Sequence, residues 1–267
     1  MAQLWFHQIY LYQKPPVLAK HFPAEIPKRA KLFCHPFNEA KNTGCYFFSP
    51  IDFEFKLTER QILLKVNTDD GGIKEWEVSI DQEPSNNNFI LLSDISEQKS
   101  KACLQSYRQR INKEKAPDFI DVNNFGFYEV MLNVFIEKES KEVFLQIWLG
   151  GVLETKHGAG LFIKHPSNVL SDPGFICLDG IIDSSNWQGW LAVVIKPTHR
   201  DRWVHVSSEL PLCQVIGFPT PISSLENISA EHVEQDVFMR PIQWHLFDET
   251  YNRKPGKYQR ELSDRRK

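Results

Sequence analysis

The sequence contains no apolar run long enough to cross a membrane. A membrane-spanning helix needs roughly 18 consecutive apolar residues, and no stretch of the 267 residues reaches that length. An excess of one charge is also lacking, because 31 lysines and arginines stand against 34 aspartates and glutamates, a formal net charge of −3. A nearly neutral chain has no electrostatic basis for binding nucleic acid or an anionic lipid surface. We therefore expect neither a nucleic-acid partner nor a membrane partner.

Paired cysteines are lacking as well. The five cysteines are odd in number, scattered, and form no CxxC pair. This distribution is typical of reduced thiols in the cytoplasm rather than of a secreted disulfide framework. The first residues have no basic segment and no small-residue cleavage site, so we expect no signal peptide. These absences together predict a cytoplasmic protein.

The sequence does contain many segments with the residue pattern of β-strands. Apolar residues make up 42% of the chain and aromatic residues 12%, which is enough for a full hydrophobic core. Ile51 to Leu57 alternates apolar and charged residues without a break, as expected for an antiparallel strand with one wet face. Ile62–Val66 and Trp76–Ile80 continue the pattern, with Asp69–Gly72 as the turn between them. These runs predict an N-terminal sheet, and we expect the N-terminal segment, residues 1–16, to form the first strand.

The later part of the chain predicts many more short strands. Phe119–Glu137 and Glu142–Leu149 indicate a hairpin, and the main helical pattern, at Glu97–Lys115, indicates one surface helix. Strands this numerous and evenly spaced favour an all-β barrel or sandwich. After residue 218 the pattern ends, so we expect residues 1–218 to form a single β-rich domain and 219–267 a partly helical C-terminal extension with a basic tail. The other strands are predicted at Phe89–Leu92, Gly160–Lys164, Phe175–Ile182, Trp190–Ile195, Trp203–Val206 and Leu212–Phe218.

Three short segments carry a first resemblance. They are Gly44 with Phe48–Phe53, Gly180–Asp183 with Trp187, and Leu210–Val215. Across most of its length the chain resembles, through these segments, an uncharacterised bacterial family, a domain of unknown function. That family has no assigned chemistry to carry over.

The strands within 150–218 resemble a second group, the dUTPase and dCTP deaminase superfamily. Gly158–Leu161 stands where these enzymes have Arg-Ser-Gly-Leu, Gly180–Asp183 where they have Gly-Val-Ile-Asp, and Leu212–Val215 where they have Ile-Ala-Gln-Leu. The resemblance implies a β-clip fold and an oligomer, since superfamily members are often trimers. The Arg and Ser that contact phosphates are absent, because Gly158 and Ala159 occupy their places. Neither side chain can replace a guanidinium or a hydroxyl, so nucleotide hydrolysis is not expected.

A scaffold that keeps its backbone-shaping residues and loses its phosphate ligands suggests a non-catalytic binding protein, with an accessory role in a biosynthetic pathway. We expect the ligand, a peptide or a small aromatic molecule, at a mouth formed by Gly158–His165, Asp183–Trp190 and Gln214, without cofactor or bound metal. Trp187 is the expected anchor, with a barrel-capping role as the alternative. The predicted ligand-binding residues are Asp183, Trp187, Trp190, Gln214, His157 and His165.

Two enzymatic alternatives stay open. His199 and Asp201 form an HxD sequence, and with His245 they match the order of ligands in 2-oxoglutarate-dependent iron oxygenases. The competing interpretation places His199 and Asp201 in a polar loop between two strands. A residual nucleotide-acting enzyme would use Asp183.

His157 and His165 together with His205 form another candidate metal set, which we interpret as loop histidines. We interpret Cys34 and His35 as structural residues on a strand.

Overall fold

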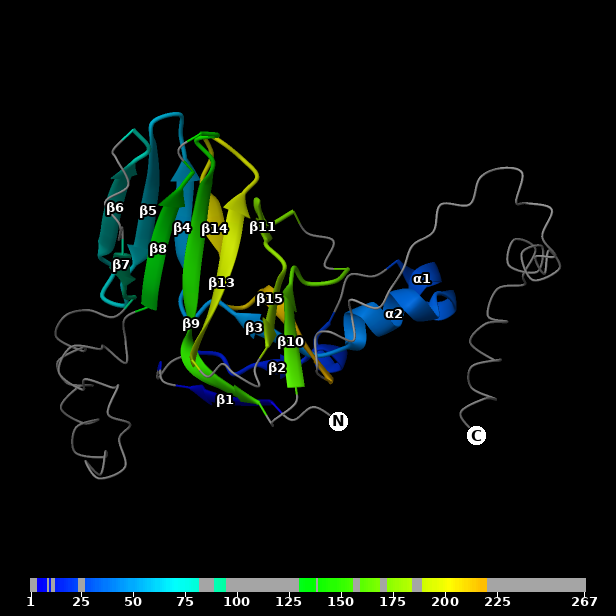
Figure 1. Cartoon of the computed structure of the whole chain (residues 1–267). Helices are drawn as coiled ribbons and strands as arrows, with labels where there is room; N and C mark the ends of the chain where they lie inside the picture. Colours follow the sequence, from blue (N-terminus) through cyan, green and yellow to red (C-terminus); the bar gives the residue numbers. More distant parts are fainter. Residues whose placement is uncertain are drawn as a thin grey trace, which may run out of the picture.

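Antiparallel strands form three sheets, and two short α-helices stand beside them (Figure 1). The computed structural model describes residues 4–8, 10, 13–23, 27–81, 89–94, 130–137, 139–155, 159–168, 172–183 and 189–219. The all-β prediction is confirmed. The surface helix predicted at Glu97–Lys115 and the extension beyond residue 219 lie outside the described residues. No described helix is long and apolar enough to span a membrane.

The four-stranded sheet contains the predicted N-terminal strands. Its middle strand β5 buries every second residue, which is the burial pattern of a sheet with one face on the core and one in water. The predicted turn is also present, and Gly71 adopts a φ of +83° there, a conformation that glycine takes without steric cost. The order is β14 (Val204–Val206), β4 (Phe53–Leu57), β5 (Gln61–Asn67) and β6 (Ile73–Ser79).

The six-stranded sheet lies over the four-stranded one in Figure 1, and side chains of both contribute to one hydrophobic core. The predicted hairpin is confirmed as β8 and β9 where the structure describes it, and residues 119–129 of its expected first strand lie outside the described residues. β9 is longer than expected, because its second half continues past Gly150 and pairs with β1. The strands are β11 (Phe175–Cys177), β13 (Gly189–Pro197), β9 (Val143–Thr155), β8 (Val130–Ile136), β7 (Phe89–Leu92) and β1 (Leu4–Gln8).

The five-stranded sheet corrects one prediction. The single strand expected at Phe175–Ile182 is two strands, because the chain leaves the six-stranded sheet after β11 and enters the five-stranded sheet as β12. The crossing lies at Leu178 and Asp179, and the Asp179-Gly180 pair that interrupts the apolar run is a turn signal that the prediction passed over. The order is β12 (Gly180–Asp183), β10 (Ala159–Lys164), β15 (Pro211–Pro219), β3 (Cys45–Phe48) and β2 (Val17–Leu18).

The two α-helices correct another prediction. Cys34 and His35 do not lie on a strand: Cys34 separates α1 (Lys28–Phe33) from α2 (His35–Asn42). Pro36 sits in the first turn of α2, where its missing N–H costs no helical hydrogen bond. A short 3-10 turn, Ala19–His21, precedes them, and beside it Ala19, Tyr46 and Phe48 form a second, small core.

Candidate functional site

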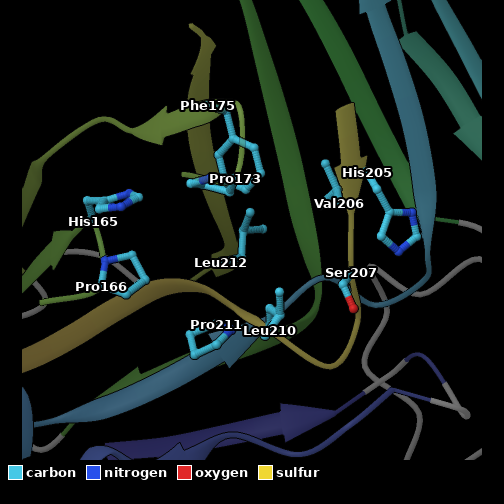
Figure 2. A pocket seen from close by; sticks show the side chains of 10 residues that line it. All are labelled: His165, Pro166, Pro173, Phe175, His205, Val206, Ser207, Leu210, Pro211 and Leu212. Atoms are coloured by element: carbon cyan, nitrogen blue, oxygen red, sulfur yellow. The ribbon is translucent and has the colours of Figure 1, made fainter. Parts of the chain in front are cut away.

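The pocket described for this structure lies where strands of all three sheets meet, and we call it the proline pocket. β10 and β15 of the five-stranded sheet, β11 of the six-stranded sheet and β14 of the four-stranded sheet all border it (Figure 2). Its cavity volume is about 30 Å³, and it opens to solvent. The lining residues are His165, Pro166, Pro173, Phe175, His205, Val206, Ser207, Leu210, Pro211 and Leu212.

The apolar lining is built from strand ends. Pro166 follows the end of β10, Pro173 precedes β11, and Pro211 begins β15. Proline is well placed at these points because it cannot donate a hydrogen bond to the sheet ladder. Phe175 and Leu212 are buried beneath the opening, whereas Leu210 is 51% exposed at its rim. The pocket therefore has a fixed apolar wall and one exposed leucine.

The two histidines stand at opposite ends of the proline pocket (Figure 2). His165 Nδ1 accepts a hydrogen bond from the backbone N–H of Cys177 at 3.2 Å, so this nitrogen carries no proton. Burial lowers the pKa of His165, the charge of Lys164 lowers it further, and Asp179 opposes the shift. His205 is exposed and lies 3.9 Å from Glu54. Both rings border the pocket, and the structure does not bring them together.

Gln214, predicted to bind a ligand, is fully buried and engaged by the fold. Its Nε2 donates to the carbonyl oxygens of Ala40 at 2.9 Å and Thr43 at 2.6 Å. Its Oε1 accepts the N–H of Ser167 at 3.0 Å. The side chain thus fastens the end of α2 and the turn after β10 to β15. A ligand contact by Gln214 stays a prediction, and it would have to compete with these three internal bonds.

The residues predicted to form the mouth do not all lie close together. Asp183 pairs with Gly160 on one side of β10, whereas Gln214 pairs with Lys164 on the other side. Two strand spacings of about 4.8 Å and four residues of about 3.3 Å place the two main chains roughly 16 Å apart. Trp190 belongs to β13, in a different sheet. The side chains of Asp183 and Trp190, and the whole of His157 and Trp187, lie outside the described part.

The iron-oxygenase alternative depends on a loop between β13 and β14. His199 Nε2 lies 2.9 Å from the carboxylate of Asp172, which also accepts the N–H of Gly174 at 3.0 Å. Asp201 is exposed, and its backbone N–H donates to the carbonyl of Leu57. Among the described residues no group of three or more His, Cys, Asp or Glu is placed to hold a metal. His245 lies outside the described residues, so the alternative stays untested.

Sequence reasoning found His165 and weighed His205, and it missed the prolines of the pocket. Pro166, Pro173 and Pro211 are far apart in the sequence, and only the pairing of β10 with β15 and the turn into β11 bring them together. The available signal was local: each proline adjoins a predicted strand end. That signal marks a loop, and it does not say which loops are neighbours.

Comparisons with known proteins give little support for a particular family. No family model matches the chain, and no curated protein matches it. Among solved structures, a point mutant of the dUTPase of Staphylococcus bacteriophage 80alpha is similar over 40% of this chain and 80% of the phage chain. The sequence identity is 17% and the TM-score 0.27. At that TM-score the likeness carries no argument, so the dUTPase-like character remains a resemblance.

Proposed function

We propose that this chain is a non-catalytic binding protein whose proline pocket accepts a peptide side chain or a small aromatic molecule. The observation that carries the proposal is the lining itself: apart from His165, His205 and Ser207, every lining residue is apolar. Ligand pockets are typically apolar with a few placed polar groups. Prolines add rigid walls that lose little conformational entropy when a ligand binds.

The polar groups of the proline pocket favour binding over catalysis. A nucleophilic hydroxyl needs a base within hydrogen-bond reach. Ser207 Oγ instead accepts the backbone N–H of Glu209 at 3.0 Å. His165 already uses Nδ1 as an acceptor, which leaves its Nε2 as a neutral N–H donor toward a ligand. The pocket can therefore offer an apolar surface at its opening and one hydrogen bond to a ligand group. The accessory role in a biosynthetic pathway is an expectation that rests on the resemblance alone.

The experiment titrates two probes into the isotope-labelled full chain and monitors the chemical shifts of the protein by NMR. Indole serves as the aromatic probe, and a blocked hexapeptide of alternating proline and leucine serves as the peptide probe. Leu210→Ser removes apolar contact at the rim, and Leu32→Ser is the control because Leu32 is similarly exposed, at 55%, on α1. Losing about 1 kcal/mol of apolar burial predicts roughly fivefold weaker binding for the Leu210 variant and no change for the control.

The outcomes separate the proposal from its rivals. Binding of the peptide alone assigns a peptide site, and binding of indole alone assigns a small-molecule site. If neither probe shifts the resonances of Phe175 and Leu212, or if both variants weaken binding equally, the proline pocket is not the site. Stoichiometric iron in the purified protein that is lost in His199→Ala would overturn the non-catalytic proposal.

A further inference from the structure

The outer face of the six-stranded sheet is apolar, although it points away from the core. Side chains in a strand alternate between the two faces, and in β8 and β9 the residues Val130, Leu132, Leu145 and Ile147 are buried on the inner face. The alternate positions on the outer face include six large apolar side chains: Phe89, Leu91, Phe135, Phe144, Trp148 and Ile176. We call this surface the outer apolar face.

The four-stranded sheet shows what an outer face in water looks like in this same protein. Its outward positions on β4, β5 and β6 include Glu54, Lys56, Lys65, Glu75 and Glu77. The inner faces of the two sheets pack on the same core, so the core does not explain why one outer face is charged and the other apolar. β8 and β9 read VMLNVFI and VFLQIWL, near-continuous apolar runs typical of strands covered on both faces. Exposed apolar side chains on these strands are therefore the pattern expected of a face that is covered.

The polar groups of this face are suited to an identical partner. Gln146 is on β9, the middle strand of the five-strand path, and pairs with Asn133 on one side and Val194 on the other. Asn133 is only 5% exposed, whereas Gln146 is half-buried. The Gln146 amide both donates and accepts hydrogen bonds, so the same amide of a second copy can satisfy it. At the rim, Lys196 pairs with Glu142, which brings both signs of charge and no net charge. Such a surface has no preference for a strongly acidic or basic partner.

We propose that the outer apolar face is the interface of a homodimer, with the two-fold axis near Gln146. In such an interface each copy presents the same patch, and two sheets pack face to face about 10 Å apart. Four strand spacings of about 4.8 Å and two row spacings of about 6.7 Å give a span of about 19 by 13 Å between the outermost strands and rows. That is below the roughly 800 Å² that each partner of a stable complex contributes, so the dimer is weak and depends on protein concentration.

The test is sedimentation equilibrium of the full chain from about 1 to 200 µM. Phe135→Glu places a charge at a position that is 43% exposed on the outer apolar face. Ile73→Glu makes the same kind of change at a position that is 62% exposed on the outer face of the four-stranded sheet. The wild type and the Ile73 variant should dimerise in this range. The Phe135 variant should lose at least about 100-fold in dimer affinity, since two buried rings are replaced in each dimer.

Gln146→Lys locates the axis, because a two-fold axis near this residue places the two new cations beside each other. It should dissociate the dimer, and added salt should partly restore association through screening. Circular dichroism of each variant checks that the fold is intact. A wild type that stays monomeric at 200 µM overturns the proposal. In that case, a lower thermal midpoint for Phe135→Glu than for Ile73→Glu would show that another part of the same chain covers the face.

Discussion

Replacing Gln214 by leucine should destabilise the protein strongly, although the residue lies outside the hydrophobic core cluster. The change removes two donors to backbone carbonyls and one acceptor for a backbone N–H, all at a fully buried site. A buried polar group that loses its partner costs about 1 to 3 kcal/mol. The three groups share one side chain, so their costs do not add fully, and we expect a total of about 3 to 5 kcal/mol.

That loss is a large part of the roughly 5 to 15 kcal/mol that stabilises a typical domain. With a urea m-value of about 2.5 kcal/mol per molar, the unfolding midpoint should fall by about 1.5 M. Gln61→Leu on β5 is the control, because Gln61 is half-buried and its replacement should cost less than about 0.5 kcal/mol. Gln214→Glu separates the bonds: the new side chain still accepts from Ser167 and can no longer donate to Ala40 and Thr43.

Hydrogen exchange gives a local measurement of the same effect. The N–H of Ser167 donates to the Gln214 side chain, so in Gln214→Leu this amide should exchange at least ~10 times faster relative to amides in β5. The reasoning is refuted if Gln214→Leu unfolds within about 1 kcal/mol of wild type. Weaker ligand binding at unchanged stability would instead assign Gln214 to ligand contact, as the resemblance to dUTPase-type enzymes suggested.

Three further outcomes follow from the structure. Burial lowers the pKa of His165, so as the pH falls the unfolded chain takes up this proton before the folded one, and stability should fall below about pH 6.5. His165→Asn should reduce that loss of stability, measured by urea titrations at pH 7 and pH 5. His205→Asn, at an exposed position, is the control variant. Gly44→Ala should destabilise the fold by several kcal/mol, because Gly44 has a φ of +78° and a Cβ there meets a backbone carbonyl of β15. Gly71→Ala, at a φ of +83° in open space, should cost only about 1 kcal/mol. Thermal unfolding measures both. Burial raises the pKa of the Cys177 thiol to about 12, so at pH 8 it should resist alkylation in the folded protein and react after unfolding in urea, as mapped by mass spectrometry.

Local periodicity predicted the strands best where one face is wet. β4 alternates charged and apolar residues, β5 buries every second residue, and the structure places both as expected. The prediction was wrong at Cys34 and His35, where a short helix pair forms without a long apolar stripe. It was also wrong at Phe175–Ile182, where Asp179 and Gly180 interrupt the apolar run and the chain changes sheet.

The sequence by itself determined the fold class, since alternating side chains, turn glycines and the lack of long helical patterns depend on neighbours along the chain. Only the tertiary structure decided which strand ends meet, because strand pairing joins residues far apart in sequence. That pairing separated Asp183 from Gln214, tied Gln214 to the end of α2, and brought three distant prolines around one pocket.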